Sequence, residues 1–281
     1  MVFIAYNLCS MDFLTSSHSE YSFHDELYAE IDEGFLNRPV FSGFRKRMIC
    51  DFLRVANLSH DSDVLSIGCG AGLWEEMLAG YVKCVVGLDI SVRAVERART
   101  RCSNIHNLSF NVLDVTTEGD TLPGNGFDAV CLFGFLHHIP EKVLPAVLMA
   151  VFKTLRPGGV VYSFDPSHRR FIGHFKGLVR NTYARFHSPD ERELDLRELE
   201  RCYADSGFQI LAVKWADFFT IPIVYLFPNA PSWAITPLSA LDRLLVKAPY
   251  LRNFASSFAI LARSVKADSY GEREPDRYGN P

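Results

Sequence analysis

From Asp63 onward, short apolar or β-branched runs alternate with segments of helical periodicity. The runs are Val64–Ile67, Cys84–Leu88, Leu108–Leu113, Phe127–Phe133, Gly159–Phe164, Phe208–Trp215 and Phe258–Ala262. Between them, Leu73–Ala79, Val92–Arg101 and Glu141–Leu155 predict crossover helices. Such alternation is typical of an α/β fold, a parallel sheet with helices on both faces.

The chain divides by composition into one large domain and two flanking segments. Residues 1–60 predict an N-terminal helical prefix or lid with a helix at Phe41–Val55, and residues 61–264 predict the α/β domain. Insertions at about 166–190 and 218–256 interrupt its second half, and an acidic helix over Glu191–Ser206 follows the first of them. Residues 265–281 are polar and predict a disordered tail.

Charge and cysteine usage restrict the classes of function. The net charge of −4 provides no global basic field, so we expect no nucleic acid partner. Seven cysteines stand singly, without the paired spacing of a zinc site, which favours a reduced, cytoplasmic compartment. The uncharged segment Phe218–Leu241 contains four prolines, which argue against a membrane-spanning helix.

The segment Val64-Leu-Ser-Ile-Gly68-Cys69-Gly70-Ala-Gly72 runs from a buried strand through three glycines into a helix. Glycines there allow a sharp turn and let a ligand approach backbone N–H groups at the helix start. The fingerprint of a dinucleotide site has a further glycine at position 73, where this chain has Leu73. Asp89 ends the next strand, where a carboxylate can accept both hydroxyls of a ribose. A nucleoside cofactor of either kind would suit Asp89.

Together with Asp114, Phe127-Asp-Ala-Val and Leu155-Arg-Pro-Gly-Gly159, these motifs resemble the class I S-adenosylmethionine (SAM)-dependent methyltransferase family. The resemblance covers about residues 64–161 and implies a seven-stranded, mostly parallel sheet with SAM as cofactor. It implies that the glycine loop borders the methionine part of SAM, that Asp89 holds the ribose, and that the Asp114 region meets the adenine. The cofactor-binding residues so implied are Gly68, Cys69, Gly70, Gly72, Asp89, Ile90, Asp114, Val115 and Phe133.

Candidate catalytic residues lie at the ends of the fourth and fifth strands. His137 and His138 follow the fourth strand, and a histidine near neutral pKa can take a proton from a hydroxyl. Asp165 ends the fifth strand, at the edge where open α/β sheets bind ligands. A structural role for the histidines and turn capping by Asp165 are the alternatives. The turn lacks the carboxylate cluster of magnesium-dependent relatives, so we predict no metal.

The acceptor is only loosely indicated. Residues 166–189 combine five basic residues with aromatic and aliphatic ones and no acid, which beside the 218–241 segment predicts a basic, apolar acceptor region. Methylation of an oxygen in a small-molecule, glycan or lipid-linked acceptor fits, with peripheral membrane contact; a solvated basic face and a packed insertion or homodimer contact is the alternative. An NAD(P)-dependent oxidoreductase and a non-catalytic SAM-binding scaffold are the other functions left open.

Overall fold

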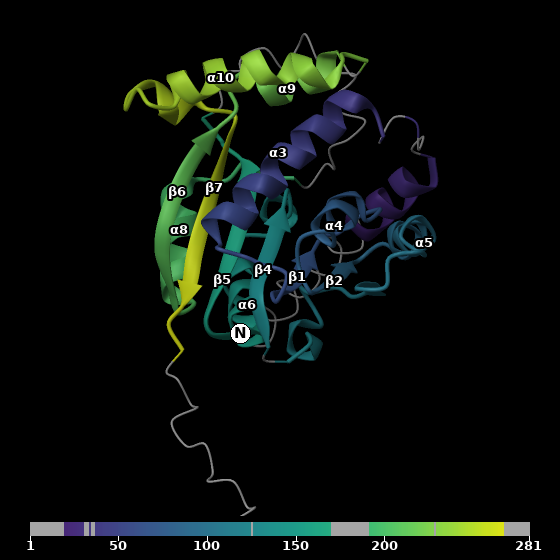
Figure 1. The fold of residues 1–281 in the computed structure, drawn as a ribbon. Coiled ribbons are helices and arrows are strands. Elements are labelled where there is room, and N and C mark those ends of the chain that lie inside the picture. Colours follow the sequence, from purple (N-terminus) through teal and green to yellow (C-terminus); the bar gives the residue numbers. More distant parts are fainter. Residues whose placement is uncertain are drawn as a thin grey trace, which may run out of the picture.

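The computed structural model describes residues 20–30, 34, 37–124, 126–169, 191–227 and 229–266. Within them, a seven-stranded sheet has the order β3-β2-β1-β4-β5-β7-β6 (Figure 1). Only β7 runs antiparallel to its neighbours β5 and β6, so the predicted fold class is confirmed. The strands are β1 (Asp63–Ile67), β2 (Cys84–Asp89), β3 (Leu108–Val112), β4 (Phe127–Phe133), β5 (Leu155–Pro166), β6 (Phe208–Ala216) and β7 (Ser257–Ser264).

Strand burial follows position in the sheet. The central strands β1 and β4 are buried almost throughout, as expected for parallel strands covered on both faces, whereas the edge strand β3 buries only Phe110. The ends of β4 agree with the sequence prediction. β5 begins at Leu155, earlier than the predicted Gly159, because Leu155 pairs with Phe127 ahead of a shift in register.

Helices cover both faces of the sheet. On one face, α6 (Leu144–Thr154) and α8 (Leu196–Asp205) pack against the core; on the other lie α3 (Pro39–Val55) and α4 (Leu73–Leu78). The α5 helix (Val92–Arg101) packs beside β2 and β3. The α3 helix belongs to the sheet's own core, since Phe44, Ile49 and Phe52 are buried in the same cluster as Val64 and Tyr162.

In the second half of the chain, one predicted helix starts later than expected, and the predicted basic stretch lies mostly beyond what the structure describes. The helix predicted over Glu191–Ser206 begins only at Leu196, because the Asp195 side chain caps it by accepting hydrogen bonds from the Arg197 and Glu198 N–H groups. The basic stretch lies mostly outside the described residues, as do residues 1–19 and the tail from 267 onward.

The insertion between β6 and β7 is helical. It contains α9 (Thr220–Leu226), the 3₁₀ turn η4 (Ser232–Ala234), α10 (Ile235–Leu245) and the 3₁₀ turn η5 (Leu251–Phe254). These helices lie across the top of the sheet in Figure 1. Among the described helices, none has the length and apolar character required to cross a bilayer.

A buried carboxyl group lies beneath the glycine loop. Glu75, in the first turn of α4, is fully enclosed and accepts a hydrogen bond of 2.5 Å from the Ser66 hydroxyl on β1. Burial raises the pKa of Glu75 to about 7. The pair therefore fastens the start of α4 to the strand that carries the loop, with Glu75 protonated below neutral pH.

Glu75 predicts a pH-dependent stability. Its pKa is near 4.5 when unfolded and about 7 when folded, so the folded state holds the proton more tightly. The free energy of unfolding should therefore decrease as the pH rises from about 4.5 to about 7, and Glu75 should account for up to roughly 3 kcal/mol of that decrease. Denaturant unfolding at pH 5 and pH 8 should show that Glu75→Gln removes that part of the decrease.

The control is Glu76→Gln, which changes the exposed neighbouring carboxylate on the same helix. It should leave the pH dependence of unfolding nearly as in the wild type. Equal pH dependence in the wild type and Glu75→Gln would contradict the protonated, buried state of Glu75.

Candidate active site

The loop after β1 forms a tight cradle. Gly68, Gly70 and Gly72 all have positive φ angles, of 77°, 52° and 76°, which L residues with side chains rarely adopt. The loop returns to the next strand through the Gly68 and Cys69 N–H groups, which both donate to the Leu88 carbonyl. A side chain at Gly70 would collide with the Tyr28 hydroxyl, 2.2 Å from the place its Cβ would take. The backbone of the loop is thus left bare toward the residue 20–30 helix.

Asp89 joins the ends of the first two strands. One carboxylate oxygen accepts the Gly70 N–H at 2.8 Å, and the other accepts the Ser91 N–H at 2.9 Å. Burial raises the pKa of Asp89, while these two backbone donors act in the opposite direction by favouring the carboxylate. Each oxygen retains acceptor capacity, so the carboxylate can also receive the two hydroxyls of a ribose.

The other residues predicted to bind the cofactor lie around this centre in different ways. The Cys69 side chain is buried in a cluster with Val95 and Phe110, so only its backbone faces the loop. Asp114 accepts hydrogen bonds from both the N–H and the hydroxyl of Thr116, which caps the turn after β3. The remaining predicted residues are Ile90, half-buried after β2, and Val115 and Phe133, both buried, with Phe133 stacked on Trp74 at 4.6 Å.

A helix over residues 20–30, purple in Figure 1, lies against this edge of the sheet beside α4 and α5. Its Asp25 accepts hydrogen bonds from the Ser91 hydroxyl at 2.9 Å and from the Arg93 backbone at 3.1 Å. The Tyr28 hydroxyl lies over Gly70. This helix therefore covers the Asp89 end of the site; that the prefix acts as a lid stays a prediction, and the helix is called the lid below.

His137 is held by the carboxylate predicted beside it. Its Nδ1 lies 3.0 Å from Asp165 Oδ1, which also accepts the His137 N–H at 3.2 Å. Both side chains are buried, and burial raises the pKa of Asp165 to about 7. The carboxyl group thus acts both as the turn cap and as an anchor that fixes the imidazole. When Nδ1 carries the proton donated to Asp165, His137 Nε2 is left as the basic nitrogen.

His138 belongs to a second group of titratable side chains at the same exit. Its Nδ1 lies 3.2 Å from Glu20 Oε2 and 3.7 Å from Glu191 Oε1, and its ring meets that of His24 edge to face. Burial, followed by the neighbouring His137, lowers the pKa of His138 to about 4, so it is neutral at physiological pH. A positive charge on His24 or His138 would lower the pKa of Asp89.

Sequence reasoning missed the lid's share of this group. Glu20, His24 and Tyr28 recur at a spacing of four residues and so lie on one helical face. That spacing was the available signal, but contact with the β4 exit depends on tertiary packing. Two sets of three side chains, Glu20/His24/His138 and His137/His138/Glu191, have separations that would allow a cation. The absence of a metal from the reaction stays a prediction.

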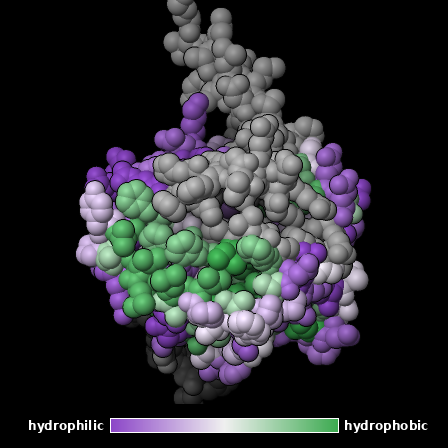
Figure 2. Space-filling model, turned by 90° about the horizontal axis from the view of Figure 1, so that it is seen from above, coloured by the Kyte–Doolittle hydropathy of each residue, from purple (hydrophilic) through white to green (hydrophobic). Residues whose placement is uncertain are grey.

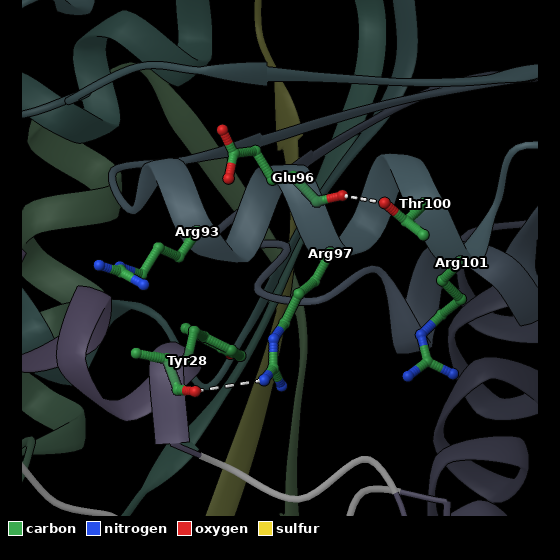
Figure 3. Close-up of a pocket in the computed structure, with 7 residues that line it drawn as sticks. Tyr28, Arg93, Glu96, Arg97, Thr100 and Arg101 are labelled. Carbon is green, nitrogen blue, oxygen red and sulfur yellow. Dashed lines mark hydrogen bonds between the residues drawn. The ribbon is translucent and has the colours of Figure 1, made fainter.

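An open pocket of about 510 Å³ adjoins the lid on its outer side. It lies between the residue 20–30 helix and α5, and Figure 3 shows Arg93, Arg97 and Arg101 along one side of α5. Arg93 pairs with Asp25, and Arg97 donates to the Ala29 carbonyl at 3.5 Å. None of its lining residues is among those predicted to bind the cofactor or to act in catalysis. These contacts fasten the lid to α5.

Known proteins match this chain over the segment that carries the glycine loop and Asp89. A family model for a methyltransferase domain matches residues 64–159. The chain is 28% identical over 176 residues to demethylmenaquinone methyltransferase of Tropheryma whipplei, covering 58% of this chain and 71% of that protein. It is 29% identical over 117 residues to the ubiquinone biosynthesis O-methyltransferase of Idiomarina loihiensis, covering 41% and 46%.

Solved structures show the same fold. The N-methyltransferase NodS of Bradyrhizobium japonicum, in complex with S-adenosylhomocysteine (SAH), aligns with a TM-score of 0.57 at 14% identity, covering 88% of this chain and 98% of that one. The antiparallel β7 between β5 and β6 also departs from the strand order of dinucleotide-binding folds, against the oxidoreductase alternative. From the motifs, the topology and these matches together, the chain belongs to the class I SAM-dependent methyltransferases.

Proposed function

We propose that this enzyme transfers the methyl group of SAM to an oxygen of a small-molecule, glycan or lipid-linked acceptor, in the cytoplasm and in peripheral contact with a membrane. The observation that carries the assignment of the reacting centre is the position of the His137–Asp165 pair beside the Asp89 cradle. The cofactor end and a candidate proton acceptor share one edge of the sheet. A hydroxyl must lose its proton when its oxygen is methylated, so the reaction calls for a proton acceptor, which a free amine does not need in order to attack.

The residues present fit the cofactor. The Asp89 carboxylate would hold the ribose hydroxyls, and the glycine loop would allow the methionine part to approach the backbone without a side chain between them. Tyr28, on the lid, lies where its hydroxyl can contact a group bound over Gly70. SAM supplies an electrophilic methyl group on a positively charged sulfur. The protein's own task is to align the acceptor and remove its proton.

His137 is the group we propose for that proton. Asp165 would keep its Nδ1 protonated, so that Nε2 takes the proton that the acceptor hydroxyl loses and later releases it to solvent. The lid and the segment before α8 bring Glu20 and Glu191 to the same exit, where their carboxylates can bind acceptor hydroxyls. His138, neutral and enclosed between them, would position the acceptor.

The acceptor class is supported by the chemistry around the exit. Two of the similar relatives are named as a demethylmenaquinone methyltransferase and a ubiquinone biosynthesis O-methyltransferase. Carboxylates and imidazoles at the exit suit a hydroxylated head group, and the helices of the β6–β7 insertion lie at the same edge of the sheet. A molecule with a hydroxylated head and an apolar tail would satisfy both.

Removing the Asp89 carboxylate should weaken cofactor binding. Hydrogen bonds to a charged group contribute about 1.5–3 kcal/mol, so calorimetric titration of Asp89→Ala with SAH should show affinity lower by roughly tenfold to a hundredfold. Asp63→Ala removes a carboxylate at the opposite end of β1 and should bind as the wild type does. Equal SAH affinity in the wild type and Asp89→Ala would remove Asp89 from the site.

The proposed base has a separable kinetic signature. General acid–base catalysis contributes about a hundredfold to ten-thousandfold, so His137→Ala and Asp165→Asn should lower kcat by amounts in that range while SAH affinity stays constant. His138→Ala should mainly raise KM for the acceptor. Rates are measured by SAH release with a phenolic or sugar acceptor, and His60→Ala, an exposed histidine remote from this edge, is the control. Unchanged kcat in both variants would show that transfer needs no protein base.

Chelation tests the predicted absence of a metal. Treatment with EDTA followed by gel filtration should leave both SAH affinity and kcat unchanged, because His137 rather than a cation is proposed to activate the acceptor. Loss of activity after EDTA, restored by one divalent cation, would instead assign the Glu20, His24 and His138 side chains to a metal.

A further inference from the structure

The insertion between β6 and β7 forms a roof over one edge of the sheet. It comprises residues 217–256, from the end of β6 to the start of β7, and carries α9, η4, α10 and η5. Because β6 runs parallel to β5, it ends at the carboxyl edge of the sheet, where the glycine loop and the His137 exit also lie. The outer surface of this roof is hereafter called the roof face.

The α10 helix buries two polar side chains and exposes two leucines. Ser239 and Asp242 are buried, and Asp242 accepts hydrogen bonds from the Phe219 and Thr220 N–H groups at 3.0 Å and 3.1 Å. On the opposite side, Leu241 and Leu244 point outward. A helix of a soluble domain normally buries its leucines and exposes its polar residues. As a result, α10 presents an apolar surface to water.

That surface extends beyond α10. Trp233 is 70% exposed, Leu244 64%, Phe227 61% and Tyr250 81%, all within the roof. Figure 2 looks down on this side of the molecule and shows hydrophobic side chains gathered into a continuous area bordered by hydrophilic ones. A continuous exposed apolar area marks an interaction site, whereas isolated exposed apolar side chains are normal on a protein surface.

The charges of the roof are of one sign on the outside. Its acidic residues are Asp217 and Asp242, and both are buried. Arg47 of α3 donates hydrogen bonds to Asp217 at 2.6 Å and to the Ser239 hydroxyl at 3.0 Å. These two bonds hold the roof to α3. Arg243, Lys247 and Arg252 are exposed. The roof face therefore combines aromatic and aliphatic side chains with positive charge alone.

Building on the peripheral membrane contact of the proposed function, we propose that the roof face docks on an anionic lipid bilayer. Trp233, Leu241 and Leu244 enter the interface, and Arg243, Lys247 and Arg252 meet the lipid phosphates. Aromatic and leucine side chains on one side of a helix with basic residues at its border are the features of an interfacial helix. Near an anionic membrane each such cation contributes further attraction.

A second copy of this chain fits the roof face less well. A twofold contact would place the same surface on both sides, so three cations from each copy would meet without an exposed acid of the roof between them. An anionic bilayer neutralises all three. Docking would also turn the carboxyl edge of the sheet toward the membrane, the orientation that an acceptor with a lipid tail requires.

Sedimentation with vesicles tests this surface independently of methyl transfer. The full chain is mixed with vesicles of phosphatidylcholine alone or of equal parts phosphatidylcholine and phosphatidylglycerol. The wild type should sediment with the anionic vesicles, and less so as salt is raised. Trp233→Ser/Leu244→Ser should weaken partitioning by about tenfold or more. Arg243→Ala and Lys247→Ala should each weaken it about fivefold, on anionic vesicles only.

The matched control is Tyr81→Ser/Met149→Ser, which removes two exposed apolar side chains outside the roof and should sediment as the wild type does. SAH affinity measured on every variant verifies that the cofactor domain is folded and separates this test from that of the proposed reaction. The proposal is overturned if the wild type stays in the supernatant with both vesicles, or if the roof and control variants partition alike. It is also overturned if the wild type does not sediment but is a dimer that Trp233→Ser/Leu244→Ser dissociates.

Discussion

The Asp89 carboxylate ties together the parts of the molecule that are proposed to bind SAM. It accepts one N–H from the glycine loop after β1 and one from the turn after β2, so two loops from neighbouring strands are held at a fixed separation. Below it, the buried Ser66–Glu75 hydrogen bond holds the helix that follows the loop. Above it, Asp25 of the lid binds the same Ser91 turn. Strand, loop and lid thus converge on one carboxylate.

The acceptor side is built by a different principle. Its side chains come from four separate parts of the chain: the lid, the turn after β4, the end of β5 and the segment before α8. Asp165 is the fixed point, since it is buried and anchors His137, whereas Glu20 reaches the site from the residue 20–30 helix. The nucleoside cradle is therefore largely made of backbone, and the acceptor exit of side chains that the lid helps to assemble. This division suits a family in which one cofactor serves many acceptors.

The features that local sequence could predict are those fixed by backbone conformation. Gly68, Gly70 and Gly72 indicate positive φ angles, and Asp89 is a carboxylate at a strand end, so the cradle could be predicted from the sequence. The His137–Asp165 contact joins residues at two neighbouring strand ends and was foreseeable as proximity only. Glu75 could not be foreseen, because an acid in the first turn of a helix is usually exposed to solvent. The burial of Ser239 in α10 likewise depends on Arg47 of α3, which binds its hydroxyl and which no local pattern contains.

The central proposal is that the Asp89 cradle holds SAM and its product rather than a nicotinamide. Its most direct test is a calorimetric titration of the wild-type chain with SAH and, separately, with NADH. We predict saturable binding of one SAH per chain and no heat of binding from NADH. Binding of NADH without SAH, or of neither, would contradict it.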